Sequence, residues 1–528
     1  MWIALALVAI ATFSWYYYRK MNYWRTLGVP QPSFLFNIGQ IANLFVQKRS
    51  FADAVALMYN MFPDKRYAGV YSFNSPILMI RDPELLKELT VKNFDHFTDH
   101  TNVISEKAEP LWGKNLFALK GKRWREMRPI LSPSFTSSKM RAIFVLISEC
   151  AENFAEHFKK SPEKTVEIEL KDSFTRFTND VIATAAFGVK SDSLADKDNQ
   201  FYLMGKELTN FSAGFLSTLK LLFIIAFPKV IEVLKLRIFK KEVADFFVKT
   251  IEETVETRKK MGIVRQDMIH LLIEAQKGLS ENNKEAEVED ESFAAQTESD
   301  LGKAQTVQKE LTNMDIAAQA LIFFFAGFES VSSLMCFMGY ELAANPDIQD
   351  RLREEIMDTL DSHNGKLTYE ALIKMNYLDM VVSEALRKWP SAGAVDRECT
   401  KPYTIEPKLP GEKPVHMQLK QVIWIPIYAI HRDPFVYPDP EKFDPERFNE
   451  YNKDNINPYN YLPFGAGPRN CIGSRFALLE IKTVFFHLLA NFKVVPTEKS
   501  QIPLKLALKS FNLTAEGGFW FGLEKINN

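Results

Sequence analysis

The feature that most constrains the fold is a single long apolar segment, residues 312–345. Thr312 can cap a helix, Asp315 suits its first turn, and Pro346 ends it. The segment contains ALIFFFAG and VSSLMCFMGY, so the predicted helix is apolar on nearly every side. A helix of this kind must run through the middle of a large protein or through a membrane.

Two acidic residues inside predicted helices need partners. Ala326-Gly327-Phe328-Glu329-Ser330 interrupts the long helix with small and polar groups. A buried carboxylate is costly unless it is paired, so Glu329 requires a partner within the fold. A second helix is predicted after Asn376, and it places Glu384 and Arg387 three residues apart on one face, where they can pair.

The rest of the pattern mixes helices with short strands. Residues 66–82 alternate around Asn74-Ser75-Pro76 and predict a hairpin, whereas residues 137–160 have the apolar spacing of a helix. Short strands are expected near 403–406 and 421–427. No internal repeat or Gly/Ser linker divides the body, so the sequence predicts one mainly α domain with small β-sheets (α+β), from residue 34 to residue 528.

Composition excludes some classes of protein and leaves others open. Lysine and arginine number 65 against 66 acidic residues, so the charge balance gives no indication of nucleic-acid binding. The 42 phenylalanines fit either a large aromatic core or an aromatic-lined cavity for apolar ligands. Residues 211–227 are strongly apolar and form either a buried helix or a surface that enters lipid. The acidic segment 281–303 is expected to be a surface loop.

The N-terminus has the composition of a membrane anchor. Residues 2–18 are almost wholly apolar and uncharged, and basic residues follow at Arg19, Lys20 and Arg25. A cleaved signal peptide is the rival interpretation, but its small-residue pair lies inside the apolar run and no positive charge precedes it. We expect residues 1–20 to anchor the chain and residues 21–33 to form a basic, proline-containing hinge. Basic residues after an anchor stay cytosolic, which places the body in the cytosol.

Cysteine usage agrees with that compartment and singles out one residue. The four cysteines are scattered without paired spacing, which argues against a disulfide framework. Cys471 lies in the segment Phe464–Gly473 (FGAGPRNCIG), where two glycines let the backbone bend and Arg469 places a cation nearby. A helical pattern follows directly. A cysteine at the start of a helix is stabilised as a thiolate, the form that ligates iron.

This segment and three others, in this order, resemble the cytochrome P450 family. The shared patterns are Ala326-Gly327-Phe328-Glu329-Ser330, Glu384-x-x-Arg387, Pro445-Glu446-Arg447-Phe448 and Phe464-x-x-Gly-x-Arg-x-Cys-x-Gly. The resemblance extends from Pro30 to near Lys525 and is strongest to insect microsomal members of the third clan. It implies a triangular, helix-rich body with haem b between the central helix and the cysteine loop.

The resemblance also assigns roles to individual residues. It makes Cys471 the axial iron ligand and gives Glu384, Arg387 and Arg447 a buried ion-pair network under the haem. The expected haem contacts are Trp124, Arg128, Ala326, Arg397, Phe464 and Arg469. Glu329 and Ser330 match the acid–alcohol pair that relays protons during oxygen activation, although the family usually has threonine at the second position. Serine keeps the hydroxyl group but loses the methyl group that limits its rotamers.

Substrate contacts follow from the same resemblance. The residues expected to face the substrate are Phe117, Ala118, Ile322, Phe325, Ala392, Val395 and Phe511. Nearly all are apolar, which favours a lipophilic substrate, while plain core packing remains open for each of them.

No GxGxxG fingerprint or Walker loop follows a strand in this sequence, so electrons must come from a partner. By resemblance that partner is NADPH–cytochrome P450 reductase, with cytochrome b5 as a second donor, at the cytosolic face of the endoplasmic reticulum membrane. The leading hypothesis is insertion of one oxygen atom from O2 into a lipophilic molecule, with xenobiotics favoured. Two alternatives stay open: a haem-thiolate isomerase or dehydratase acting on peroxides, and a non-catalytic binder of haem or lipophilic ligands.

Overall fold

The computed structural model describes residues 1–526 except 47–48, 73–74, 103, 210–222, 224–229, 231–232, 235–236, 238, 266, 277–310 and 509–512. Three sequence predictions fall on the excluded positions. Almost all of the apolar segment 211–227, the acidic segment 281–303 and Phe511 lie outside the described residues.

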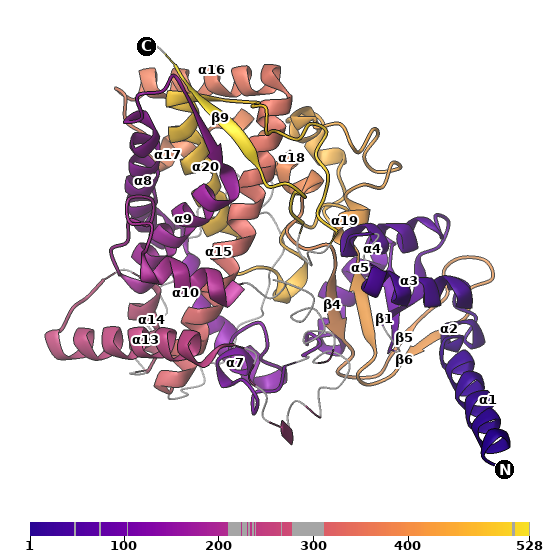
Figure 1. Ribbon diagram of the computed structural model, residues 1–528. Coiled ribbons are helices and arrows are strands. Elements are labelled where there is room, and N and C mark those ends of the chain that lie inside the picture. Colours follow the sequence, from indigo (N-terminus) through magenta and orange to yellow (C-terminus); the bar gives the residue numbers. More distant parts are fainter. Residues whose placement is uncertain are drawn as a thin grey trace.

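The long apolar segment forms helix α15 (Asn313–Ala344), which runs through the helix-rich part of the molecule (Figure 1). Thr312 and Asp315 form a reciprocal capping box at its start, and the helix ends just before Pro346, as predicted. It packs against α9 (Leu170–Ile182), where Gly327 lies against Ile182 and Gly339 lies against Leu170. Among the described residues it is the one helix long and apolar enough to cross a membrane, but more than half of its most apolar stretch is buried inside the protein. α15 is therefore the central core helix.

Most of the other helices surround α15 on one side of the molecule, whereas α5 and α19 lie on the other side, near the first sheet (Figure 1). The longer ones are α8 (Ser137–Lys159), α10 (Gln200–Thr209), α13 (Lys241–Met261), α14 (Met268–Gln276), α16 (Pro346–Ser362), α18 (Asn376–Lys388) and α20 (Ser474–Asn491). Shorter ones are α5 (Pro83–Lys87), α6 (Pro110–Gly113), α7 (Gly121–Leu131), α17 (Tyr369–Ile373) and α19 (Ile427–Ile430). α8 and α18 confirm the helices predicted from spacing.

Three small sheets complete the body, which confirms a mainly α protein with small β-sheets. Strands β1 (Tyr67–Ser72) and β2 (Ser75–Ile80) form the predicted antiparallel hairpin. β2 pairs in parallel with β7 (Val422–Ile425), which pairs antiparallel with β4 (Val395–Glu398). The second sheet has the order β3 (Thr165–Glu169), β9 (Trp520–Lys525), β8 (Phe492–Val495), and the third pairs β5 (Tyr403–Ile405) with β6 (Val415–Met417).

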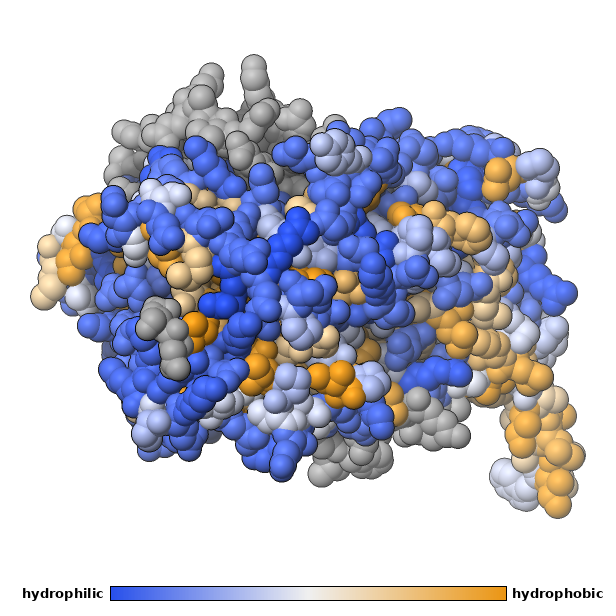
Figure 2. Space-filling view, turned by 90° about the horizontal axis from the view of Figure 1, so that it is seen from above, coloured by the Kyte–Doolittle hydropathy of each residue, from blue (hydrophilic) through white to orange (hydrophobic). Residues whose placement is uncertain are grey.

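The N-terminal helix α1 (Trp2–Lys20) projects away from the body (Figure 1). None of its residues is buried, and Figure 2 shows it as an apolar arm beside a largely polar surface. The predicted hinge 21–33 behaves differently, because Met21 and Trp24 are fully buried and the Trp24 indole N–H donates to the Val70 carbonyl of β1 (3.3 Å). This segment, which contains α2 (Tyr23–Thr26), is docked on the body together with the neighbouring α3 (Phe34–Val46) and α4 (Phe51–Asn60).

Candidate active site

The segment Phe464–Gly473, here called the ligand loop, is held by its own backbone. The Cys471 N–H donates to the Phe464 carbonyl (2.8 Å), and the Asn470 N–H donates to the Gly467 carbonyl (2.9 Å). Gly467 has a φ of 69°, and a Cβ there would lie 2.0 Å from the Thr90 carbonyl oxygen. Only glycine fits this position. The sequence thus forces the loop to turn tightly and present Cys471 next to Phe464.

The Cys471 side chain is accessible, although residues 466–469 of the same loop are buried. It still lies deep among protein atoms, and this burial raises the pKa of its thiol, against the lowering effect of the Gly473 N–H and of the Arg128 guanidinium. Helix α20 begins at Ser474, three residues beyond the sulfur. The Gly473 N–H and the Arg128 guanidinium favour the thiolate form that the sequence analysis expects, and a metal cation bonded to the sulfur would act in the same direction.

Three buried arginines, here called the arginine cluster, lie at the ligand loop: Arg128 on α7, which acts on the Cys471 thiol, Arg397 on β4 and Arg469 in the loop itself. Burial lowers the pKa of each guanidinium, to about 10 for Arg128 and Arg397 and to about 9 for Arg469. Repulsion between Arg397 and Arg469 adds to the effect at Arg469. The protein therefore concentrates positive charge at a cost that its own carboxylates, Asp99 beside Arg469 and Asp396 beside Arg397, recover only in part.

Each arginine of the cluster is attached to the ligand loop. Arg128 donates to the carbonyl (3.0 Å) and side-chain oxygen (2.9 Å) of Asn470, and Arg397 donates to the Ala466 carbonyl (3.2 Å). The Arg469 guanidinium lies 4.2 Å above the Trp124 ring, and it also donates to the carbonyls of Thr98 and Leu119 (both 2.7 Å). These contacts bring Trp124, Arg128, Arg397 and Arg469, four of the residues expected to contact haem, to the loop that carries Cys471.

Two donors of the cluster remain unused. Among the described residues, Nε of Arg128 and Nε of Arg397 are buried without a hydrogen-bond partner. Buried guanidinium N–H groups that lack acceptors fit the carboxylates of a ligand. An accessible cysteine sulfur with arginines beside it matches the iron and the propionates of haem b, so the residues present fit this group. Phe464 is partly buried and packs against the main core.

One face of α15 is less buried than the rest of the helix. Ile322, Phe325, Glu329 and Ser330 are half-buried there, and Ala326 is exposed in the middle of a core helix. Phe135 connects this face to the ligand loop, because its ring lies 5.4 Å from that of Phe323 and next to Gly473. The predicted acid–alcohol pair thus lies on the accessible side of the central helix.

The partner that Glu329 requires is Lys171 on α9. The Lys171 ammonium lies 3.0 Å from a Glu329 carboxylate oxygen and donates to the hydroxyls of Ser332 (2.9 Å) and Ser333 (2.8 Å). The Ser330 hydroxyl donates to the Ala326 carbonyl (2.6 Å) within the helix. Sequence spacing gave no indication of Lys171, since α9 and α15 are far apart along the chain.

The predicted substrate contacts divide into groups. Trp112 brings two of them together, because its ring lies 6.4 Å from Phe117 and 5.5 Å from Phe325. The segment that contains Ala392 lies against the same face of α15, where the Ser391 hydroxyl donates to the Ser330 carbonyl (3.5 Å). Ala118 is buried in the core and Val395 is half-buried in β4. The sequence pattern did not single out Trp112.

On α18, Glu384 and Arg387 form a fully buried pair joined by two hydrogen bonds, of 2.6 and 2.8 Å. Arg387 also donates to the carbonyls of His431 and Pro440 (both 2.8 Å), and Glu384 accepts from the Asp444 N–H (2.9 Å). Arg447 lies 3.5 Å from Glu384. We call this set of residues, with His431, the closed network.

His431 links the closed network to the ligand loop and was not predicted. Its Nδ1 contacts the Arg387 carbonyl (3.2 Å), and its Nε2 accepts from the Leu462 N–H (2.7 Å), two residues before Phe464. Burial and the charge of Arg387 lower the pKa of His431 to about 3. The imidazole is therefore neutral, with its proton on Nδ1.

Comparison with known proteins agrees with this geometry. The family model of cytochrome P450 matches residues 30–520. Cytochrome P450 9e2 of Blattella germanica is 46% identical over the whole chain and 97% of the relative, and probable cytochrome P450 9f2 of Drosophila melanogaster is 41% identical over the full length of both. Cytochrome P450 6k1 of Blattella germanica is 35% identical over 98% of this chain and 95% of the relative. The chain therefore belongs to the cytochrome P450 family and is a monooxygenase that carries haem b.

Proposed function

We propose that this enzyme inserts one oxygen atom from O2 into lipophilic small molecules, chiefly xenobiotics. The electrons come from NADPH through NADPH–cytochrome P450 reductase, with cytochrome b5 as a second donor. Helix α1 holds the enzyme at the endoplasmic reticulum membrane with its body on the cytosolic face.

The observation that carries the proposal is the accessible face of α15 beside the ligand loop. Haem bound through Cys471 supplies the activation of O2. The free N–H groups of Arg128 and Arg397 bind its carboxylates, which fixes the orientation of the group. Glu329 and Ser330 lie on the same accessible face and provide a carboxylate and a hydroxyl that can hold or move a proton.

The aromatic residues around this face support a lipophilic substrate. Phe117, Trp112 and Phe325 form a continuous set of ring contacts, and Phe117 is about half exposed. Apolar rings of this kind bind an apolar molecule by excluding water. A broad range of lipophilic molecules is therefore expected to bind, which suits an enzyme that acts on xenobiotics.

Two further features support the partners. The sequence has no nucleotide-binding fingerprint, so reducing equivalents must be delivered by another protein. In α1, residues such as Trp2, Ile3, Leu7 and Phe13 are more than half exposed, and Arg19 and Lys20 lie in the last turn. An apolar helix that ends in basic residues suits a lipid bilayer with its basic end in the cytosol.

The test is a spectral and turnover screen of the purified enzyme. Addition of lipophilic compounds should shift the Soret band, and the compounds that shift it should be oxidised when the reductase and NADPH are present. Product that forms only from an added hydroperoxide, with NADPH and reductase giving none, would contradict the reductase-dependent proposal. Replacing Cys471 with alanine should abolish the haem-thiolate spectrum of the carbon monoxide complex.

A further inference from the structure

Helix α7, which carries Trp124 and Arg128, begins without a cap of its own. Lys120 occupies the N-cap position and makes no side-chain cap hydrogen bond. Instead, the Gly121 N–H donates to the carboxylate of Asp99 (2.8 Å), which lies more than twenty residues earlier in the chain. A carboxylate at the start of a helix satisfies a free N–H group and interacts favourably with the helix dipole. Asp99 therefore fixes where α7 begins.

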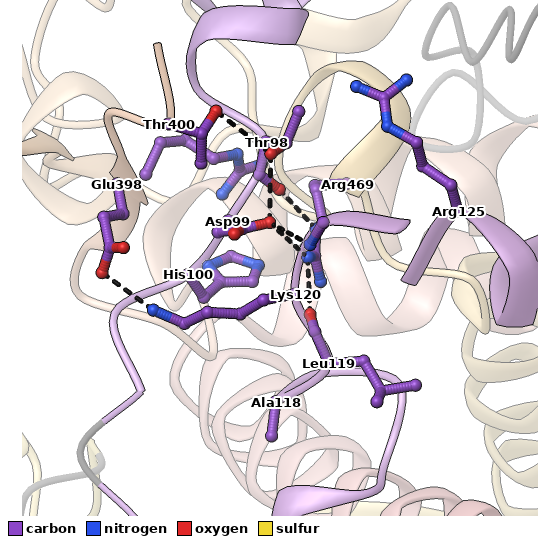
Figure 3. Close-up of polar contacts among 12 residues, drawn as sticks. Thr98, Asp99, His100, Ala118, Leu119, Lys120, Arg125, Glu398, Thr400 and Arg469 are labelled. Carbon is purple, nitrogen blue, oxygen red and sulfur yellow. Dashed lines mark hydrogen bonds and ion pairs between the residues drawn. The ribbon is translucent and has the colours of Figure 1, made fainter. Parts of the chain in front are cut away.

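The same carboxylate oxygen reaches the ligand loop. It lies 3.4 Å from Arg469 and accepts from the Thr98 hydroxyl (3.0 Å), and the ion pair is almost fully buried, with side-chain exposures of 8% for Asp99 and 2% for Arg469. Arg469 also donates to the carbonyls of Thr98 and Leu119, so it ties the start of α7 to the ligand loop (Figure 3).

Asp99 contacts the third arginine-bearing element through its backbone. The Glu398 N–H, at the end of β4, donates to the Asp99 carbonyl (2.6 Å), and β4 carries Arg397. Glu398 itself is neutralised by Lys120, at 2.8 Å. One residue thus touches α7, β4 and the ligand loop, the three elements that together hold the arginine cluster.

We propose that Asp99 is the positioning residue of the arginine cluster and the counter-charge of Arg469. Its carboxylate fixes the relative positions of α7 and the ligand loop, so that the arginines are in place before the haem carboxylates bind. Its negative charge also partly cancels the cations beside the haem, which makes reduction of the bound iron less favourable. This inference rests on the proposed role of the arginine cluster in holding the haem carboxylates.

The chain offers a matched control in Asp95, four residues earlier. Asp95 also pairs with α7, through Arg125 (2.6 Å), but both side chains are largely exposed, at 60% and 46%. An exposed ion pair contributes little to structure and is screened by salt. Asp95→Asn removes the same charge from the same segment without touching the arginine cluster.

Two substitutions separate position from charge. Asp99→Asn keeps the shape and an acceptor for Gly121 but removes the charge, whereas Asp99→Glu keeps the charge and moves it by one methylene group. Two quantities are measured on the haem-loaded enzyme: the midpoint potential, by spectroelectrochemical titration, and the rate of haem transfer to apomyoglobin. Neither measurement depends on turnover.

Asp99→Asn should move the midpoint potential to more positive values and leave the rate of haem loss within about twofold of that of the unaltered enzyme, because the cap remains. Asp99→Glu should leave the potential unchanged and speed haem loss about tenfold, because a lost cap and a displaced loop weaken the site. Asp95→Asn should change neither quantity.

If the midpoint potential of Asp99→Asn equals that of Asp95→Asn, Asp99 is not the counter-charge of Arg469. An Asp99→Glu enzyme that loses haem no faster than Asp95→Asn would overturn the positioning role, and Asp99→Ala replaces Asp99→Glu if the longer side chain prevents folding. If the arginine cluster does not hold the haem carboxylates at all, the result is different. Arg397→Met would then retain haem normally, whatever the Asp99 variants do.

Discussion

The closed network and the arginine cluster are both buried and both rich in arginine, yet they are completed in different ways. Arg387 has hydrogen-bond partners for its Nε and for both terminal nitrogens, including a carboxylate and two or more carbonyls. By contrast, Arg128 and Arg397 each keep an Nε with no partner among the described residues. The Glu384–Arg387 pair is thus satisfied by the protein itself, whereas the arginine cluster is not. Arg447, at the edge of the closed network, also keeps an Nε without a hydrogen-bond partner, 3.5 Å from a Glu384 carboxylate oxygen.

This difference separates residues that hold the fold from residues that hold a ligand. A buried charge with all of its partners belongs to the folded protein, and removal of one partner leaves the other charge stranded. A buried guanidinium that keeps an N–H group without an acceptor, as Arg128 and Arg397 do, raises the free energy of the protein until an acceptor binds. Variants in the closed network should therefore affect folding, and variants in the arginine cluster should affect haem retention.

The largest effect is expected for Arg387→Ala. It strands the Glu384 carboxylate, which is 0% exposed, and we expect a loss of about 3–5 kcal/mol in the free energy of unfolding. Urea unfolding followed by circular dichroism measures this loss. The control is Arg351→Ala, which breaks an exposed pair with Glu446 (55% and 44% exposed) and should cost about 1 kcal/mol or less. Equal losses in the two variants would contradict the comparison.

His431 predicts how the closed network responds to acid. Its pKa is about 3 in the folded protein against 6.5 when unperturbed, so only the unfolded chain binds this proton between these values. Its contribution to stability is complete above pH 6.5 and is lost as the pH falls toward 3, by about 1.4 kcal/mol per pH unit. His431→Gln lacks the titrating group and should lose less stability between about pH 7.5 and about pH 5, by about 2 kcal/mol in urea unfolding.

Other buried histidines also contribute to the pH dependence of stability that is measured for His431→Gln. His100 and His487 also have their pKa values lowered to about 4 by burial, and they titrate in both proteins. Only the difference between the two pH dependences reports on His431. Parallel stability curves for the variant and the unaltered enzyme would show that protonation of this imidazole does not open the network.

Arg397→Met tests the open side of the comparison. Methionine removes a buried cation whose Nε has no partner, so the polypeptide should remain folded, with an unchanged far-ultraviolet circular dichroism spectrum. Haem should leave at least about tenfold faster, because one carboxylate loses its partner. Haem transfer to apomyoglobin measures the rate. A variant that is clearly less stable in urea unfolding but loses haem no faster than the unaltered enzyme would reverse the roles of the two regions.

The sequence predicted what depends on local pattern. The capped central helix, the hairpin, the Glu384–Arg387 pair and the cysteine loop follow from spacing and from turn residues, and all appear in the structure. Their interactions join residues that are close along the chain or belong to a recognisable motif. The order of the motifs then identified the family.

The residues that complete the site were not predictable in the same way. Lys171, Asp99 and His431 each contact a residue that lies far away along the chain and is brought near only by folding. The separations are 158 residues for Lys171 and Glu329, 370 for Asp99 and Arg469, and 31 for His431 and Leu462, and no local pattern marks these pairs. The raised pKa of the Cys471 thiol also escaped prediction, because burial outweighs the helix start only once the tertiary fold surrounds the sulfur. Local pattern thus singles out Cys471, whereas tertiary packing sets the surroundings of its sulfur.

The smallest effect on stability is expected at Lys171, whose pair with Glu329 lies between the two extremes. The pair is satisfied by protein groups, but its side chains are 24% and 26% exposed, so Lys171→Met should cost about 1 kcal/mol or less in urea unfolding.

The main effect of Lys171→Met should appear instead in the coupling of NADPH consumption to product formation. Without the ammonium, the Glu329 carboxylate is free to change its position, and more NADPH should be consumed per product, by about twofold to fivefold. Lys171→Arg retains the cation and should keep the coupling near that of the unaltered enzyme. Product and NADPH measured in the same reaction give the ratio, and equal ratios in both variants would show that Lys171 holds Glu329 without influencing proton delivery.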